Sequence, residues 1–156
     1  MDTLLFLCPG IPLHLKAPMP GSIRAEDDSL AAHLRRRRSE LGLTLGAVAA
    51  LLHADPKAVG SWERGAQLPF VSTYPAIIQY LGREPWAEPQ SLGAALLAER
   101  RRRGIEVLKA AALVGVGEGT WRRWERGEWK PGRQKLPALD QLLGYTIAER
   151  FPSEVR

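Results

Sequence analysis

Apolar side chains recur at helical spacing along two stretches of the chain, and no stretch shows the strict alternation of a β-strand. Leu30, Leu34 and Leu41 fall on one helical face, and Gly42 follows them as a helix-ending residue. Ser29 precedes this run after three acidic residues, which is typical of a helix start. The pattern therefore predicts helices and an all-α protein.

Capping residues and helix breakers divide the first stretch further. Thr44 and Asp55 are helix-capping types, Pro56 suits the first position of a helix, and Gly65 and Gly82 suit helix ends. Together with the apolar spacing they predict four or five short helices, placed near residues 30–41, 44–52, 55–64 and 73–81.

The same plan occurs twice, which is the strongest signal in the sequence. The segment Trp62-Glu63-Arg64-Gly65 returns 62 residues later as Trp124-Glu125-Arg126-Gly127, and a proline follows each copy. Without a gap, residues 30–82 align on residues 92–144 with 18 identities in 53 positions. A fixed internal period indicates a repeated structural unit, so the sequence predicts two tandem all-α domains.

The remaining segments are an arm at 1–29, a linker at 83–91 and a tail at 145–156. The arm is rich in proline and is expected either to extend over the first domain or to be disordered. A stretched linker of this length reaches roughly 30 Å, and neighbouring half-sites on DNA lie roughly 34 Å apart. Trp86 in the linker is expected to dock on a domain, and the tail to fray into coil.

Composition narrows the class of protein. The chain has 156 residues, a net charge of +5 and a pI near 9.8, which suits a nucleic-acid partner, although a solvated basic surface is the alternative. Its single cysteine, Cys8, excludes an intrachain disulfide framework. No apolar run is long enough to cross a membrane, and Leu4–Leu7 is too short for a signal peptide. We therefore expect a cytoplasmic protein.

Two short helices joined by a tight turn inside a compact helical unit form the helix-turn-helix layout. The segments RRSELGLTLGAVAALLHADPKAVGSWERG and RRRRGIEVLKAAALVGVGEGTWRRWERG resemble the Cro/cI-type (XRE-like) helix-turn-helix regulators, in particular their tandem subgroup. The resemblance implies two compact lambda-repressor-like domains, each with a recognition helix in the major groove. It implies a transcriptional regulator whose partner is double-stranded DNA.

One pairing is implied by the same resemblance. Family members have an arginine late in the first helix that pairs with the glutamate ending the third. Here Arg38 precedes Glu63 by 25 residues, and Arg100 precedes Glu125 by the same distance. The resemblance makes each pair a structural ion pair, and two independent surface charges are the alternative.

The third helix of each repeat divides into two faces. Val59, Trp62, Trp121 and Trp124 are assigned to the core. The opposite stripe, which the resemblance places in the major groove, holds Lys57, Gly60, Ser61 and Arg64, and in the second repeat Gly119, Arg122, Arg123 and Arg126. The alternative is a solvated basic face.

The second repeat carries more charge, with eleven basic and six acidic residues against six and three in the first. Lys130, Arg133 and Lys135 follow its recognition helix, where family members contact phosphate. The predicted DNA-binding residues are Lys57, Ser61, Arg64, Arg122, Arg123, Arg126, Lys130, Arg133 and Lys135. In the arginine runs 35–38 and 100–103, the residues outside the ion pairs are expected to be solvated or near phosphate.

Several positions depart from the family pattern. Leu45 and Val107 stand where members often place a phosphate-anchoring glutamine, and Asp55 and Glu118 put negative charge at the recognition-helix starts. These departures motivate an alternative function: a degenerate helix-turn-helix protein that acts through a protein partner, such as an antitoxin-like or mobile-element accessory factor. The sequence also leaves open whether the protein forms a homodimer.

No other chemistry is evident in the sequence. His14, His33 and His53 lack metal-ligand spacing, and no phosphate-binding glycine motif or catalytic triad pattern occurs. We therefore expect no catalytic residue, metal, cofactor or small-molecule ligand, and no enzyme activity.

Overall fold

The computed structural model describes residues 29–155, and this part of the chain is helical without strands. Unit one contains α1 (Leu30–Glu40), α2 (Leu45–Leu51), α3 (Pro56–Glu63), η1 (Val71–Thr73) and α4 (Tyr74–Leu81). Unit two contains α5 (Leu92–Arg103), α6 (Val107–Leu113), α7 (Glu118–Glu125), η2 (Arg133–Lys135), α8 (Leu136–Leu143), α9 (Ile147–Arg150) and η3 (Pro152–Glu154). The predicted all-α class is confirmed, and the predicted arm lies outside the described residues except for Ser29.

The predicted helix starts of unit one are capped as expected. The hydroxyl of Ser29 accepts from the backbone N–H of Ala32 at 3.2 Å, and that of Thr44 accepts from Ala47 at 3.1 Å. Asp55 accepts from the N–H of Lys57 at 2.8 Å. These bonds satisfy N–H groups that the first helical turn leaves without a partner.

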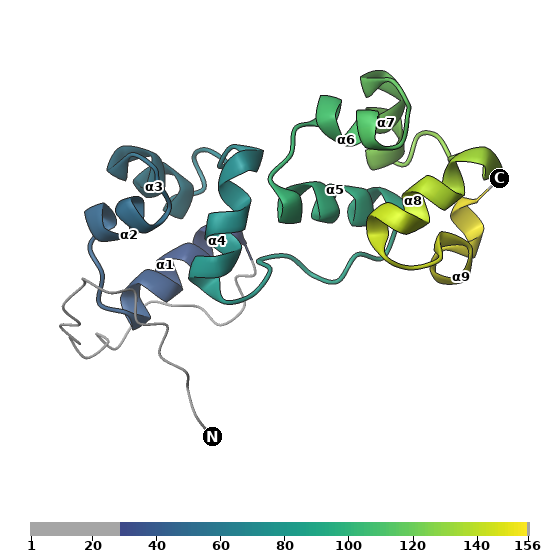
Figure 1. The fold of residues 1–156 in the computed structure, drawn as a ribbon. Helices are drawn as coiled ribbons and strands as arrows, with labels where there is room; N and C mark the ends of the chain where they lie inside the picture. The colour runs from purple at the N-terminus through teal and green to yellow at the C-terminus, as the bar shows by residue number, and fades with distance from the viewer. Residues whose placement is uncertain (1–28, 156) are drawn as a thin grey trace.

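The helices form two units that lie side by side (Figure 1), and each unit has its own buried apolar cluster. In unit one the cluster includes Val59 and Trp62 of α3, and in unit two it includes Trp121 and Trp124 of α7, as predicted. Helices α1 and α2 pack against α3, and α5 and α6 pack against α7 in the same way. The third helix of each unit is therefore held from behind by two others.

The C-terminal segment differs from the expected coil. It forms α9, whose first residue Ile147 is fully buried, and Phe151 after it is also buried in the core of unit two. The side chain of Asp140 on α8 accepts from the N–H of Ile147 at 2.8 Å. The segment is too short for helical periodicity to show in the sequence, so its order depends on this packing against α8.

The two units touch through α4 and α5. Arg101 of α5 lies over the rings of Tyr74 (5.0 Å to the centroid) and Trp86 (5.7 Å), and these two rings are 6.0 Å apart. Gly104 has a φ of 63°, and a Cβ built there would lie 2.8 Å from Cγ of Pro75. Trp86 thus docks on a folded unit, as predicted, and holds the linker against the contact.

The second arginine run has partners that the sequence analysis did not assign. The guanidinium of Arg102 donates to Glu84 of the linker at 2.5 Å, and this hydrogen bond lowers the pKa of Glu84. Arg103 donates to Glu99 at 2.6 Å and to the carbonyl of Leu142 at 2.9 Å. Both side chains are exposed to solvent, as expected, and they also join α5 to the linker and to α8.

Candidate nucleic-acid interface

An ion pair ties α1 to the end of α3 in unit one. Nε of Arg38 lies 2.7 Å from Oε1 of Glu63, and Nη2 lies 2.8 Å from Oε2, which makes the pair bidentate. The carboxylate of Glu63 is only 6% exposed. Arg38 also donates to the carbonyl of Leu43 after α1, at 3.4 Å. The hydrogen bond to Glu63 raises the pKa of Arg38 above its ordinary value.

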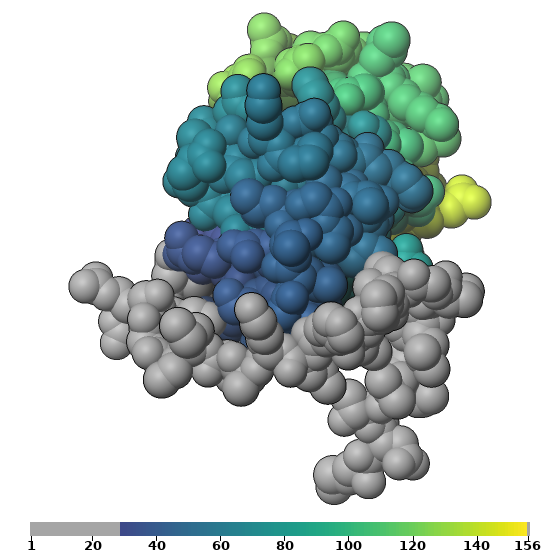
Figure 2. Space-filling model, turned by 90° about the vertical axis from the view of Figure 1, so that its left-hand side faces the viewer, coloured from purple at the N-terminus to yellow at the C-terminus, as the bar shows by residue number. Residues whose placement is uncertain are grey.

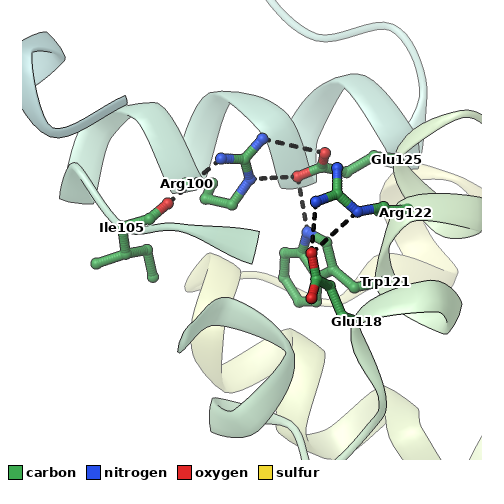
Figure 3. A network of polar contacts seen from close by, with 6 residues as sticks. All are labelled: Arg100, Ile105, Glu118, Trp121, Arg122 and Glu125. Carbon is green, nitrogen blue, oxygen red and sulfur yellow. Dashed lines mark hydrogen bonds and ion pairs between the residues drawn. The ribbon is translucent and has the colours of Figure 1, made fainter. Parts of the chain in front are cut away.

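Unit two repeats this arrangement with one addition (Figure 3). Arg100 donates to Glu125 through Nε at 2.7 Å and through Nη2 at 3.2 Å, and to the carbonyl of Ile105 at 3.3 Å. Nε1 of the fully buried Trp121 donates to the same glutamate at 2.7 Å. Because Trp121 replaces Val59 of unit one, its indole N–H needs this acceptor. The repeated Trp-Glu-Arg-Gly segment thus anchors α3 and α7 from the core side.

The outer face of α3 surrounds an open hollow of about 450 Å³. Its lining combines residues of the predicted stripe with two apolar neighbours: Leu45, Pro56, Lys57, Gly60, Ser61 and Arg64. Arg64 donates to the hydroxyl of Ser61 at 3.3 Å, and Lys57 and Arg64 are both exposed. Figure 2 looks onto unit one, with unit two behind it. The structure therefore brings the predicted residues of this unit together on one surface.

The outer face of α7 carries arginines with acidic partners. Arg122 pairs with Glu118 one turn earlier (Figure 3), and Arg126 donates to Glu128 at 2.6 and 3.1 Å. The hydrogen bond from Arg126 lowers the pKa of Glu128. All four side chains are exposed or half-exposed, so these pairs can open at little cost.

Arg123 is held differently. Its guanidinium lies over the ring of Trp129, 4.0 Å from the centroid, a cation–π geometry. Within residues 29–155 it makes no ion pair with a carboxylate. The side chain is therefore ordered on the surface without charge neutralisation by a salt bridge.

The three basic residues after α7 have separate surroundings. Lys130 donates to the carbonyl of Ser153 at 2.5 Å. Lys135 donates to the carbonyls of Gly115 at 2.9 Å and Val114 at 3.3 Å, at the C-terminal end of α6, where a cation is favourable. Arg133 begins η2 and is exposed. Lys130 and Lys135 thus have contacts within the protein in addition to any role toward DNA.

Sequence reasoning did not single out Trp129 or Glu128 as members of this face. The spacing of four residues between Glu118 and Arg122 was a usable signal for their pair. The Arg126–Glu128 pair and the Arg123–Trp129 stack depend on how the chain turns after α7, at Gly127 with a φ of 69°. Helical spacing does not apply across this turn, so it could not predict either contact.

Other sites are not found in the described part of the chain. Residues 29–155 contain no cluster of three or more histidine, cysteine, aspartate or glutamate side chains suited to a metal ion. None of their helices has the length and apolar content needed to span a bilayer.

Comparisons with known proteins support the resemblance stated from the sequence. A model of the helix-turn-helix domain family matches the chain twice, over residues 29–87 and 91–151. No curated protein and no solved structure matches it. The second match extends beyond Gly144 into the segment that contains α9. The two matches together cover most of the chain, and the protein belongs to the helix-turn-helix domain family, with two such domains in tandem.

Proposed function

We propose that this protein is a sequence-specific regulator of transcription that binds double-stranded DNA through α3 and α7 in the major groove. The observation that carries the proposal is the pair of exposed basic faces on these helices, each anchored from behind by an Arg–Glu pair. An α-helix fits the major groove, where every base pair presents a distinct pattern of donors, acceptors and methyl groups.

The placement of the units supports the proposal. In the view of Figure 1 the pairs α2–α3 and α6–α7 lie on the same, upper side of the molecule, with α1 and α5 beneath them. One chain can then present both recognition helices to one face of DNA. The contact between α4 and α5 holds them at a set separation.

Unit two supplies the stronger electrostatic contact in this proposal. Arg123 is free of salt bridges within the described residues and is the candidate for a bidentate contact with guanine. Arg122 and Arg126 have to exchange a glutamate for a phosphate or a base edge. Because these exposed pairs open at little cost, both arginines remain available to a phosphate or a base edge.

Binding to duplex DNA across a salt series tests the proposal. The logarithm of the binding constant is expected to fall linearly with the logarithm of the salt concentration. The slope should be about −0.9 for each phosphate that the protein neutralises. A specific site is first obtained by selection from random duplexes. Arg123→Ala should then weaken that site by roughly tenfold or more while changing binding to random duplex much less.

Lys130→Ala is the matched comparison, because a phosphate contact weakens specific and random duplex alike and lowers the salt slope by about one. Equal losses for Arg123→Ala on both duplexes would make Arg123 a phosphate contact. Absence of duplex binding at low salt would refute the proposed function.

One observation favours a second candidate, in which the chain acts through a protein partner. Leu68 and Phe70 after α3 are 73% and 80% exposed, at positions where unit two has Lys130 and Gly132. Exposed apolar residues of this size suit a protein contact. A stoichiometric complex that is lost in the double variant Leu68→Ser and Phe70→Ser, together with no footprint on DNA, would favour this candidate.

A further inference from the structure

The outer faces of α3 and α7 differ in the middle of each helix. Gly60 in the middle of α3 aligns with Arg122 in the middle of α7. In α7 the arginine side chain projects from the helix, whereas α3 has no side chain there. Gly60 itself is buried, with the side chains of Leu45 and Arg64 beside it, and the hollow that it lines lies where unit two has a cation.

The lining of the hollow is mostly apolar at its walls and basic at its rim. Leu45 and Pro56 supply the apolar walls, and Lys57 and Arg64 are the exposed cations beside them. Leu45 is the residue that departs from the family's phosphate-anchoring glutamine. In unit two the aligned Val107 is buried, and Glu118 aligns with Pro56, so the two surfaces differ in chemistry as well as in shape.

The geometry points to a specificity site for thymine: we propose that the C5-methyl group of a thymine enters the hollow between Leu45 and Arg64, beside Gly60. The inference rests on the proposed function and adds the base that unit one selects. The thymine methyl is the apolar group that the major groove offers to a protein. Lys57 and Arg64 at the rim match the negative charge of the flanking phosphates.

A methyl group reaches the space at Gly60 when the side chain of Arg64 shifts, because Gly60 is buried beside Arg64 and Leu45. A Cβ built on Gly60 would lie 3.7 Å from Cδ1 of Leu45, which is ordinary contact, and 3.2 Å from Nη1 of Arg64. The Arg64 contact is with the far end of a flexible side chain, which can move aside. An alanine there fills the space that the thymine methyl takes, and alanine is favourable in a helix.

Replacement of thymine by deoxyuridine tests the inference, because it removes only the methyl group. Each thymine of the selected site is replaced singly, and affinity is measured at one salt concentration. The wild-type protein should lose about fourfold in affinity at one position, the contribution of one buried methyl group. In Gly60→Ala the same replacement should cause no loss, because the methyl group is already excluded.

Gly46→Ala in α2 is the matched control, because Gly46 lies outside the stripe and a Cβ there meets only Oγ1 of Thr44 at 3.8 Å, an ordinary contact. It makes the same change in helix propensity and should keep the fourfold dependence on thymine. Thermal unfolding of both variants checks that each remains folded. DNA binding without any dependence on a thymine methyl group, or a dependence unchanged in Gly60→Ala, would overturn the inference alone. Absence of duplex binding would overturn the proposed function as well.

Discussion

Glu63 and Glu125 join the ends of α3 and α7 to the rest of each unit. Each accepts a bidentate pair from an arginine 25 residues earlier, and Glu125 also accepts from Trp121. The arginine in turn donates to a carbonyl of the turn after the first helix. One guanidinium therefore joins three segments of each unit.

Removing the buried carboxylate should be costly. Glu63→Ala leaves the guanidinium of Arg38, which is about three-quarters buried, without its counter-charge. We expect a loss of about 3 kcal/mol in the free energy of unfolding, measured with urea. Glu128→Ala breaks a pair of similar geometry that is open to solvent and should leave stability unchanged. Equal effects of the two substitutions would contradict a structural role for the Arg38–Glu63 pair.

At the scale of elements, the approach of α5 to α7 is closer than a side chain at position 93 allows. A Cβ built on Gly93 would lie 2.4 Å from the carbonyl oxygen of Glu125 and 2.8 Å from that of Trp124. Both oxygens belong to the backbone at the end of α7, which cannot move aside as a side chain does. Gly93 thereby sets the distance at which the recognition helix of unit two is held.

Gly93→Ala should therefore destabilise unit two, although glycine to alanine in a helix usually stabilises. We expect a loss of about 1–3 kcal/mol from overpacking, measured by denaturant unfolding. Gly119→Ala in α7, where space is open, should instead stabilise by up to about 1 kcal/mol. A Gly93→Ala protein that is as stable as the wild type, or more stable, would show that the Gly93 contact does not constrain the helix.

At the scale of the molecule, the units meet through unlike surfaces. The fourth helix of unit one, α4, packs on the first helix of unit two, α5. A two-fold pair would instead bring the same surfaces together, as in symmetric dimers. Because the contact is of the head-to-tail kind, α3 and α7 are not related by the two-fold symmetry that matches a palindromic DNA site.

This placement predicts how a bound site is arranged. Once a site for both units is selected, inverting the half bound by unit two, or inserting five base pairs between the halves, should weaken binding about a hundredfold. The reason is that only one unit can then bind, and the gain from linking two sites is lost. Gel-shift titration of the three duplexes measures the effect. If the two units were joined flexibly, neither the inversion nor the insertion would weaken binding.

Much of the fold and part of the site were predictable. The helices and the buried tryptophans follow from helical periodicity, capping residues and two copies of one pattern. The partners of Arg38 and Arg100 were implied by the resemblance to the Cro/cI-type regulators. Periodicity works here because each helix has a distinct buried stripe. The exposed stripes of α3 and α7 lie on the helix faces opposite the buried stripes, so the same periodicity locates them.

The sequence by itself thus determined a tandem helical protein, because local spacing specifies which helix faces are buried. Tertiary structure alone decided which groups share a surface across turns and between units. It placed Arg101 on Tyr74, set Glu128 against Arg126, packed α9 into unit two and opened the hollow beside Gly60. The physical reason is that these contacts depend on how separate segments approach one another, which no single helical period encodes.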